Sequence, residues 1–453
     1  MNSVLIRPLA TTDAIFSWEW RNDPEIWRFT GKRPDQYITP QIEKEWIEKV
    51  LSETNSKRFA IIVNDIYVGN IQLTNIAEDK TAEYHIFIGN KNYWSKGIGQ
   101  LATIQIIRYA KTILNLEALY LSVHPDNVGG IKLYEKCNFK KVNSDIKMTL
   151  NLIENLIPKA SIFMMVYNHE KYLEVALKSI LFQKCNFDFE IVIGEDNSKD
   201  GSRDLLLDYA NRFPGKFKLL LHDENIGAQK NQMRVFDNCI GKYIAMCEGD
   251  DYWTDPLKLQ KQVDFLEANP DYVLCFHEVN VLKSDGNIVE DFITKVPENY
   301  ETIESLATFG NYIHTPSVVF RNIIRKFPFE FELSPIGDYF LYMLLAEHGK
   351  LKFLKEKMAV YRFESGIYSK LEFTQKNKKW NRTLILILSY CKDDAVKLIL
   401  FNKLFKTLKL NDTIKLGEKI KPSLKKSLIK SVKLFIPPIF LLLKRKIYNS
   451  GND

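Results

Sequence analysis

The chain has 453 residues, of which 45% are hydrophobic and 12% aromatic, and these values exclude a disordered chain and predict two or three packed domains. Its net charge of +7 is uneven, because residues 401–453 carry 13 Lys and Arg against three acids and the remainder carries −3. The six cysteines include no CxxC pair, which disfavours a zinc site and a disulfide framework and predicts a cytoplasmic protein.

Strand and helix signals alternate over the first 150 residues, which predicts one α/β unit. Thr39 and Pro40 form a favourable helix start, as N-cap and first helical residue. Asn64-Asp65 separates two β-rich runs and predicts a hairpin turn. The expected strands are 4–6, 59–63, 67–73, 83–88 and 118–123, and further helices are expected over 97–110 and 130–137.

A glycine-containing loop leads into the helix expected over 97–110. It reads Asn92-Tyr93-Trp94-Ser95-Lys96-Gly97-Ile98-Gly99-Gln100. The two glycines allow a turn whose N–H groups point at an anion, on the positive end of the helix. A second strand-to-helix junction, about thirty residues later, carries Asn127 and Tyr134. Together, over residues 3–145, these motifs resemble the acetyl-CoA site of GNAT N-acetyltransferases.

This resemblance implies a GNAT fold, a mixed central sheet with flanking helices, for residues 1–148. It implies acetyl-CoA as the cofactor and Tyr134 as the acid that protonates the leaving thiolate. Trp94 stands where the family usually has Gln or Arg, so one phosphate contact is missing or replaced. The residues expected to bind the cofactor are Lys96, Gly97, Ile98, Gly99 and Asn127.

Acetylation needs a neutral amine and therefore a base or a water relay. Glu83 and His85 lie two residues apart on one expected strand, hence on one face, and Glu83 is the predicted base with His85 as the alternative. Both also fit ordinary roles, as a solvated acid and a core histidine. Residues 19–27 resemble the acceptor side of GNAT enzymes that acetylate nucleotide-activated amino sugars or ribosomal proteins, and Arg21 is a candidate phosphate ligand.

Residues 151–158 are predicted to be a linker, after which a second α/β pattern begins. Strands expected over 160–167, 189–194, 217–222 and 242–247 alternate with helices over 172–182, 204–212 and 231–238. This alternation predicts a mostly parallel sheet with helices on both faces. Ligands of such sheets bind beyond the carboxyl ends of the strands.

Three carboxylates crowd into four positions at Glu248-Gly249-Asp250-Asp251, directly after an apolar strand. Buried clustered acids are unfavourable without a cation, and a divalent metal that holds a diphosphate is the usual one. Asn168 and Asp196 also fall at the ends of expected strands. Over 159–369 this ordered set resembles inverting family 2 glycosyltransferases of the GT-A type, which implies a Rossmann-like sheet for residues 159–370.

The second resemblance implies a nucleotide-sugar donor, with Mn²⁺ or Mg²⁺ bound by Asp250 and Asp251. Asp338 matches the family's base for the acceptor hydroxyl, and its alternative role is a helix N-cap. Glu364 stands where the family usually has a histidine. The residues expected to contact the donor are Tyr167, Asn168, Glu195, Asp196, Asn225, Gly227, Asn231, Glu248 and Arg362.

From residue 371 the chain becomes helical and basic, which predicts a tail that contacts an anionic membrane surface. Residues 434–443 are apolar but interrupted by Pro437-Pro438, whereas a spanning helix needs roughly 20 apolar residues. The segment therefore predicts an interfacial anchor at the inner face of the plasma membrane. The alternative is a helix pair packed on the body, with a solvated basic face.

Together the two resemblances imply a bifunctional enzyme of surface-polysaccharide assembly. The second domain is expected to transfer a sugar to a glycan or lipid-linked acceptor, and the first domain to N-acetylate an amino sugar. In the alternatives, the first domain acetylates a protein amine or only binds CoA, and the second is a degenerate binding domain. No nucleic acid is expected as a partner.

Overall fold

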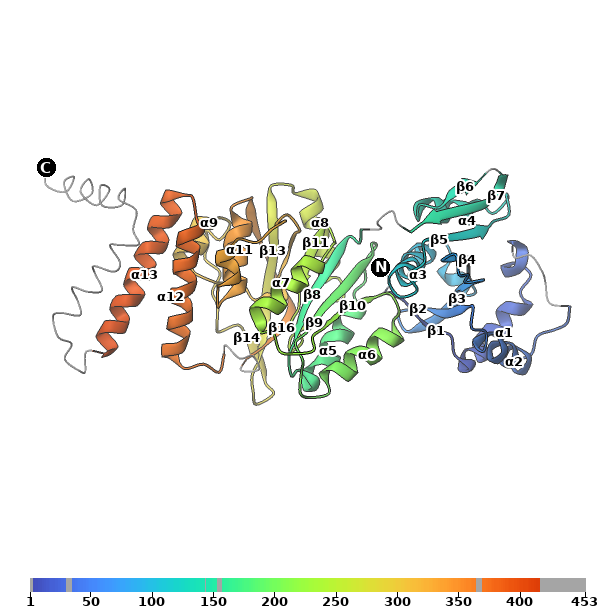
Figure 1. Cartoon of the computed structure of the whole chain (residues 1–453), viewed down its shortest axis with the longest axis horizontal. Coiled ribbons are helices and arrows are strands. Elements are labelled where there is room, and N and C mark those ends of the chain that lie inside the picture. Colours follow the sequence, from blue (N-terminus) through green and yellow to red (C-terminus); the bar gives the residue numbers. More distant parts are fainter. Residues whose placement is uncertain (1–2, 30–34, 143, 153–156, 364–368, 416–453) are drawn as a thin grey trace.

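The computed structural model describes residues 3–29, 35–142, 144–152, 157–363 and 369–415. Two sheets lie one after the other along the molecule, and two long helices close the end away from the N-terminal sheet (Figure 1). Helices flank both sheets, so the α/β class expected from the sequence is confirmed.

The first sheet has the strand order β1-β2-β3-β4-β5-β7-β6. Neighbouring strands are antiparallel except β4 and β5, which are parallel and pair only where residues 81–83 face residues 118–120. The two strands part beyond this point. The strands are β1 (Val4–Pro8), β2 (Lys57–Val63), β3 (Ile66–Thr74), β4 (Thr81–Ile88), β5 (Ala118–Ser122), β6 (Lys140–Val142) and β7 (Ser144–Asn151).

Helices cover both faces of this sheet. Val4 and Ile6 point to the face that α3 covers, where Ile106 completes the core. Ala60 and Tyr67 belong to the opposite face, under α1 and α2. The helices are α1 (Ala14–Asn22), α2 (Pro40–Leu51), α3 (Ile98–Thr112) and α4 (Val128–Lys136), with short 3-10 turns η1 (Thr11–Asp13), η2 (Ile26–Phe29) and η3 (Lys91–Tyr93).

Short-range sequence signals correctly predict the elements that they mark. The Thr39 hydroxyl accepts a hydrogen bond from the Ile42 N–H at 3.3 Å and caps α2. Asn64 and Asp65 have φ values of 47° and 66°, the left-handed pair that a two-residue hairpin turn requires. Gly97, with φ of 76°, stands at the start of α3. In each case the residues that decide the conformation lie within one turn of one another.

The second sheet has the order β10-β9-β8-β11-β15-β13-β16-β12, with β14 paired to β13. Strands β8 to β11 are mutually parallel, so their carboxyl ends lie along one edge of the sheet. The strands are β8 (Ala160–Val166), β9 (Phe189–Glu195), β10 (Phe217–Leu221), β11 (Tyr243–Met246), β12 (Tyr252–Trp253), β13 (Tyr272–Leu282), β14 (Ile288–Glu290), β15 (Val319–Arg321) and β16 (Lys350–Arg362).

Two apolar cores sandwich this sheet between helices. One core lies between the sheet and α5, α6 and α8, and the other contains residues of α7 and of α9 to α13. The helices are α5 (Glu170–Leu181), α6 (Ser202–Arg212), α7 (Ala228–Asn238), α8 (Lys258–Ala268), α9 (Ile303–Phe309), α10 (Phe329–Glu332), α11 (Gly337–Ala346), α12 (Phe373–Tyr390) and α13 (Asp394–Lys415), with a 3-10 turn η4 (Thr315–Ser317).

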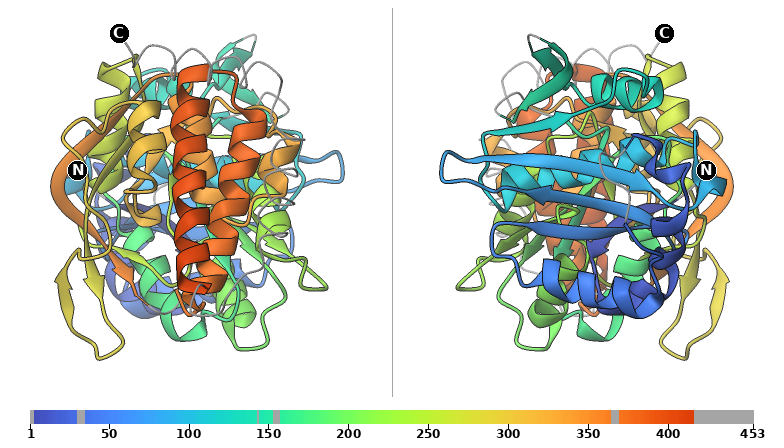
Figure 2. Two further views of the ribbon diagram at one scale, coloured as in Figure 1. Left: turned by 90° about the vertical axis from the view of Figure 1, so that its left-hand side faces the viewer. Right: turned by 90° about the vertical axis from the view of Figure 1, so that its right-hand side faces the viewer.

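Helices α12 and α13 lie side by side at one end of the molecule (Figure 2). Their buried residues Leu384, Ile387, Val396 and Leu400 belong to the core of the second domain. Trp380 of α12 also stacks on Tyr339 of α11, with ring centres 4.8 Å apart. The first part of the predicted tail therefore packs on the second domain.

Two sequence expectations for this region, the apolar segment 434–443 and the position of Glu364, lie outside the described residues. Within the ranges that the structure describes, no helix combines the length and the apolar character needed to cross a membrane.

The two domains meet at a seam between α3 and the strands β9 and β10. Gly215 lies so close to α3 that a Cβ there would meet the Gln105 carbonyl oxygen at 2.6 Å. Arg108 of α3 pairs with Asp188 across the seam. Lys216, 3% exposed, lies 3.7 Å from the same carboxylate and donates to the Phe189 carbonyl at 2.7 Å. The Arg108–Asp188 pair therefore connects the two domains, and Lys216 shares the same carboxylate from within the second domain.

Candidate active sites

Polar residues gather where the parallel strands of the second sheet end. Asn168 follows β8, Asp196 follows β9, and Glu248 follows β11. Because neighbouring parallel strands end at one edge, the fold brings these three distant segments together. We call this the donor edge, and it is defined by residues 167–168, 195–198, 225–227 and 248–251.

Asp196 holds the loop that precedes α7. Its Oδ1 accepts from the Ile226 N–H at 2.7 Å and its Oδ2 from the Gly227 N–H at 3.1 Å. The Asn225 amide donates to its main-chain carbonyl at 3.1 Å. Asp196 is only 3% exposed, so a nucleotide base would be an additional donor to oxygens that already accept from the protein.

Glu195 and Asn231 are buried within the domain behind this loop. Glu195 accepts from the Ser198 N–H at 2.6 Å and forms an ion pair with Arg203 at 2.5 Å. Asn231 donates to the Gly194 carbonyl at 2.9 Å. Both side chains therefore support the donor edge from inside the protein, and their contacts are with protein groups.

Asn168 joins the ends of β8 and β9. Its φ of 57° is left-handed, its Oδ1 accepts from the Lys199 N–H at 2.7 Å, and its own N–H donates to the Ser198 hydroxyl at 3.0 Å. Tyr167 beside it is half-buried. The two loops therefore form one connected surface.

Four carboxyl groups converge at this edge: Glu248, Asp250, Asp251 and Asp338. Burial, followed by the negative charges of Asp250 and Asp338, raises the pKa of Glu248 to about 8. Burial and the charge of Asp250 hold the pKa of Asp251 well above its usual range, and burial raises the pKa of Asp338. A bound cation would favour the ionised form of these carboxyl groups.

Arg362 covers one side of the four acids. Its N–H donates to Asp251 Oδ1 at 2.8 Å, and its Nε donates to the Asp250 carbonyl at 2.9 Å. Its guanidinium carbon lies 4.3 Å from the centre of the Tyr172 ring. Asp251 therefore connects β16 to the donor edge with one of its two oxygens.

Asp338 lies in the first turn of α11, whose N-cap is Ile336, so the N-cap alternative for Asp338 is wrong. Its Oδ2 accepts from Asn311 Nδ2 at 2.9 Å, and its Oδ1 accepts from the Tyr339 N–H at 2.8 Å. Burial, followed by the charge of Asp338, raises the pKa of Tyr342 well above its usual range, so that hydroxyl stays protonated beside the acids.

Sequence reasoning missed Asn311 and Tyr342. The spacing of Tyr342, four residues after Asp338 on one helix, was a usable signal because such residues share a face. Asn311 lies far from Asp338 in the chain, and no local pattern connects the two.

Among the described residues, no group of three or more His, Cys, Asp and Glu side chains is arranged to hold a metal ion. The donor set at the edge is nevertheless of the right chemistry, because hard divalent cations prefer carboxylate oxygens. Mg²⁺ commonly binds through one or two carboxylates and the phosphates of a substrate. Asp250 and Asp251, 6% and 2% exposed, fit that mode better than a closed protein cage.

In the first domain, the loop before α3 has free space beside Gly97. Gly97 has a φ of 76°, and a Cβ built on it would meet no atom within 4 Å. Ile98 is buried, and Gly99 lies against the Leu133 side chain. Lys96 extends over the Tyr93 ring, with its Nζ 5.8 Å from the ring centre. Main-chain N–H groups at the start of α3 and the Lys96 charge together favour an anion here.

Helix α4 has the remaining predicted cofactor residue, Asn127, at its N-cap and contains the predicted acid, Tyr134. Asn127 caps the helix, because its Oδ1 accepts from the Gly130 N–H at 2.9 Å. Tyr134 packs edge-to-face on Tyr84, the first residue of β4 beyond its pairing with β5, at a centroid distance of 5.9 Å. Burial raises the pKa of Tyr134 to about 12, so its hydroxyl is a proton donor at neutral pH.

Glu83 and His85 share a face of β4, as expected. Asn75 Nδ2 donates to Glu83 Oε2 at 2.8 Å, and His85 Nε2 lies 3.7 Å from the same oxygen. Tyr84 points to the other face, where it contacts Tyr134. The candidate acid and base therefore approach the parted strands from opposite faces of the sheet.

Arg21 is enclosed by protein groups. Its guanidinium carbon lies 4.8 Å from the Trp27 ring centre and 4.7 Å from that of Trp46. Its Nε lies 3.5 Å from the buried carboxylate of Glu43. This packing gives Arg21 a structural partner in place of the phosphate expected from the sequence.

Two family models match the chain. Residues 3–140 match the acetyltransferase (GNAT) domain, and residues 161–328 match glycosyl transferase family 2. The first match contains the Gly97 loop, Asn127 and Tyr134. The second contains the donor edge, and it ends before Asp338 and Arg362.

Curated relatives match about half of the chain. The uncharacterized protein Rv1520 of Mycobacterium tuberculosis is 37% identical over 221 residues, which cover 49% of this chain and 63% of that protein. The uncharacterized glycosyltransferase MJ1057 of Methanocaldococcus jannaschii is 28% identical over 211 residues, covering 45% of this chain and 71% of that protein. The chain thus spans less than two thirds of the length of the first relatives that it matches.

Solved structures also resemble parts of the chain. Staphylococcus aureus TarS 1-349 in complex with UDP-GlcNAc is 18% identical with a TM-score of 0.46, over 61% of this chain and 80% of that one. Spermidine N-acetyltransferase from Vibrio cholerae in complex with CoA and spermine is 22% identical with a TM-score of 0.31, over 34% of this chain and 97% of that one.

Proposed function

This chain joins a GNAT acetyltransferase domain to a family 2 glycosyltransferase domain, and from that premise we propose a bifunctional enzyme of surface-glycan assembly. The second domain transfers a sugar from a nucleotide-sugar donor to a glycan or lipid-linked acceptor, with inversion. The first domain N-acetylates an amino sugar. The observation that carries the proposal is the convergence of four carboxyl groups at the carboxyl edge of a parallel sheet.

In the second domain, the donor lies along the donor edge. Asp196 accepts a hydrogen bond from an N–H of the base. Asn225 and Gly227, on the loop that Asp196 holds, lie beside it. Glu248 accepts a hydrogen bond from a ribose hydroxyl, and Tyr167 and Asn168 are further contacts of the donor. Glu195 and Asn231 act through the loops that they support, because their own polar atoms already have protein partners.

The transfer itself needs charge neutralisation and a base. A divalent cation held by Asp250 and Asp251 would neutralise the departing diphosphate, and Arg362 lies beside both residues. Asp338 takes the proton of the acceptor hydroxyl, whose oxygen bonds to the anomeric carbon as the bond to the diphosphate breaks. The raised pKa of Asp338 suits a base, because it moves the group towards the pH at which it works.

In the first domain, the loop Lys96, Gly97, Ile98 and Gly99 binds the pyrophosphate of acetyl-CoA, with Asn127 as a further contact. Glu83, or His85 in its place, accepts the proton of the amine as nitrogen attacks the acetyl carbon. Tyr134 protonates the thiolate that leaves. The parting of β4 and β5 at Glu83 gives a route between the two faces on which acid and base lie.

The Asp338→Asn variant tests the second domain most directly. Because the amide keeps the shape of the side chain and cannot accept the proton, donor binding should persist while sugar transfer is lost. Donor binding is measured by thermal shift with UDP-, GDP- and TDP-sugars, with and without Mn²⁺. Normal transfer by the variant would place the base elsewhere.

The basic C-terminal segment supports a location in the cytoplasm, at the anionic inner face of the plasma membrane. Its 13 Lys and Arg against three acids would hold the enzyme near lipid-linked acceptors.

We propose domain boundaries at 1–148 and 159–370, with the tail from 371 beginning as the packed pair α12 and α13. Deletion of residues 421–453 should release the protein from anionic liposomes, and absence of binding by the full chain would refute the anchor.

A further inference from the structure

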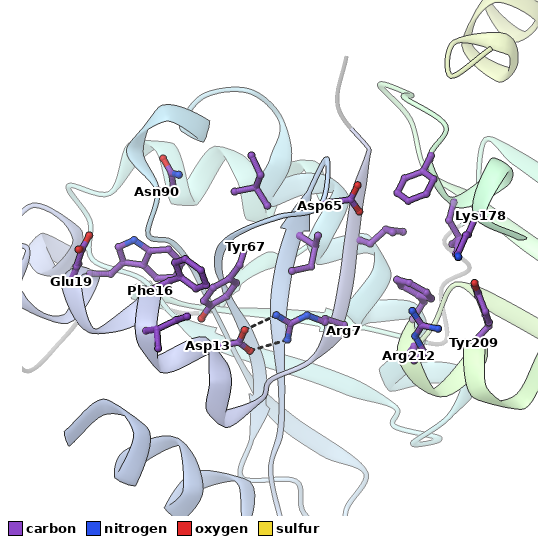
Figure 3. Close-up of a pocket in the computed structure, with 18 residues that line it drawn as sticks. Arg7, Asp13, Phe16, Glu19, Asp65, Tyr67, Asn90, Lys178, Tyr209 and Arg212 are labelled. Atoms are coloured by element: carbon purple, nitrogen blue, oxygen red, sulfur yellow. Dashed lines mark hydrogen bonds and ion pairs between the residues drawn. The ribbon is translucent and has the colours of Figure 1, made fainter. Parts of the chain in front are cut away.

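A cavity of about 730 Å³ opens between the two domains (Figure 3). One wall comes from β1, α1 and the β2–β3 turn, and the other from the carboxyl-terminal ends of α5 and α6. Its volume is that of a small-molecule site. Helix α5 begins beside the donor edge and reaches the cavity at Lys178, roughly 12 Å further along its axis. The cavity is therefore separate from the glycosyl-transfer site.

The wall from the first domain is aromatic. Trp20 packs on Tyr67 with ring centres 4.8 Å apart, and Phe16 meets Tyr67 edge-on at 6.4 Å. The Phe16 side chain is 55% exposed although it lines a cavity. Gly89 is required beside this wall, because any Cβ there would collide with the Trp20 ring. The molecule thus keeps apolar ring faces open to the cavity.

The wall from the second domain combines ring faces with hydrogen-bond donors. Lys178, Tyr209 and Arg212 lie together across the cavity from Phe16 and Tyr67 (Figure 3). Lys178 pairs with Glu174 at 2.9 Å, and Arg212 with Asp208 at 3.3 Å. All four partners are about half exposed, and such surface pairs are weak, so both cations can turn towards a ligand.

Arg7 adds a polar group in fixed orientation. Its two terminal nitrogens donate to the Asp13 carboxylate at 2.8 and 2.5 Å, and its guanidinium carbon lies 5.8 Å from the Tyr67 ring centre (Figure 3). Asp13 is held in turn by the Ala10 N–H at 2.9 Å. A planar donor locked beside an aromatic face requires little ordering when a ligand binds.

The charge of the lining indicates the class of ligand. Of the described residues that line the cavity, three are cations (Arg7, Lys178 and Arg212) and three are acids (Asp13, Glu19 and Asp65), so the charges balance. The acids of the lining would repel a phosphate, and its cations would repel a polyamine. A neutral ligand with apolar faces and many hydroxyl groups matches ring faces interleaved with planar polar side chains.

We propose that this interdomain cavity binds a neutral saccharide. The inference rests on the proposed function, because a glycan is the substrate that both domains would share. The site holds the glycan between the two domains, away from the glycosyl-transfer site.

The test is calorimetric titration of the full chain with N,N′-diacetylchitobiose and with maltose, without nucleotide, CoA or metal. At least one disaccharide should bind, and Phe16→Ala should weaken that binding about tenfold through loss of a ring face. Lys178→Ala with Arg212→Ala should weaken it as well, and these exposed positions do not threaten folding. Phe309→Ala removes a ring of similar exposure, 53%, on α9 and should change nothing.

Asp338→Asn separates the cavity from the acceptor position of the second domain, and it should leave disaccharide binding unchanged. The proposal fails if neither disaccharide binds, or if Asp338→Asn abolishes binding that Phe16→Ala leaves intact. It also fails if spermine or glucose 6-phosphate competes at the cavity more tightly than the neutral sugars. Sugar transfer without cavity binding would overturn this inference alone, whereas cavity binding in a chain without transfer activity would overturn only the proposed function.

Discussion

The two candidate sites of this chain are built from different parts of the polypeptide. In the first domain, Gly97 stands at the start of a helix with a left-handed φ and with open space where a Cβ would be. In the second, carboxyl groups that follow β11 lie close to Asp338 in the first turn of α11, and burial with neighbouring charge raises the pKa values of Glu248, Asp251 and Asp338. A main-chain site depends on backbone conformation and a carboxylate site on charge, so different substitutions should damage each.

The largest expected effect is on the carboxylate site. Asp250→Asn removes a charge from the proposed metal position and should lower metal-dependent donor hydrolysis by about 10³-fold. The measurement is release of nucleoside diphosphate at several Mn²⁺ concentrations. Acetyl transfer by the same variant is the control and should not change. Unchanged hydrolysis would refute the metal assignment.

Tyr134→Phe tests whether the first domain is catalytic. Loss of the proposed acid should lower acetyl transfer about 10²-fold, while acetyl-CoA binding measured by calorimetry stays the same. Indifference to the substitution, with no turnover on any amine, would show a CoA-binding module instead. Acetylation of peptide N-termini and not of nucleotide-linked amino sugars would contradict the proposed acceptor.

Gly97→Val tests the main-chain site through conformation. A β-branched residue is strained at φ of 76°, so the turn should shift and acetyl-CoA should bind about tenfold more weakly. Gly129→Ala is the matched control, because that glycine also has open space around it but no left-handed φ. Equal weakening by both variants would mean that added bulk, and not backbone conformation, is responsible.

The smallest expected effect concerns a buried amine behind the carboxylate site. Lys258 is fully buried, donates to Gln262 Oε1 at 2.8 Å, and has its pKa lowered by burial to about 7. Between about pH 7 and 10 the unfolded chain holds a proton that the folded chain does not, so this residue makes stability rise with pH.

Lys258→Met should remove that rise, which is at most about 1.4 kcal/mol per pH unit. Urea unfolding of the wild type and the variant at pH 7, 8 and 9 measures the difference between their slopes. Lys230→Met, at an exposed lysine of α7, should keep the wild-type slope. Parallel curves for wild type and Lys258→Met would contradict the buried-amine argument.

Sequence patterns predicted the features that neighbouring residues decide. Asn64-Asp65 gives its hairpin turn and Thr39 its helix cap, because the partners of each lie a few residues away. The parallel strands followed from alternation, and so did the meeting of Asn168, Asp196 and Glu248 at one edge.

Contacts between distant segments could not be predicted in this way. The hydrogen bonds from 226 and 227 that occupy Asp196 depend on where a loop folds back. Asn311, in the loop after α9, meets Asp338 because α9 packs against α11. The basic residues of α12 and α13 could be read from the sequence. The burial of Leu384 and Leu400 could not, because it depends on the surface of the second domain against which they pack.

The seam at α3 limits the modularity of this protein. Exchanging the glycosyltransferase half for another would leave Arg108 without its carboxylate, and removing the acetyltransferase half would expose Asp188 and Lys216. A replacement partner would also need a residue as small as Gly215 where α3 passes. The two domains can therefore be recombined only when the residues on both sides of the seam change together. An engineered hybrid should keep these seam residues as a first requirement, before either active site is transferred.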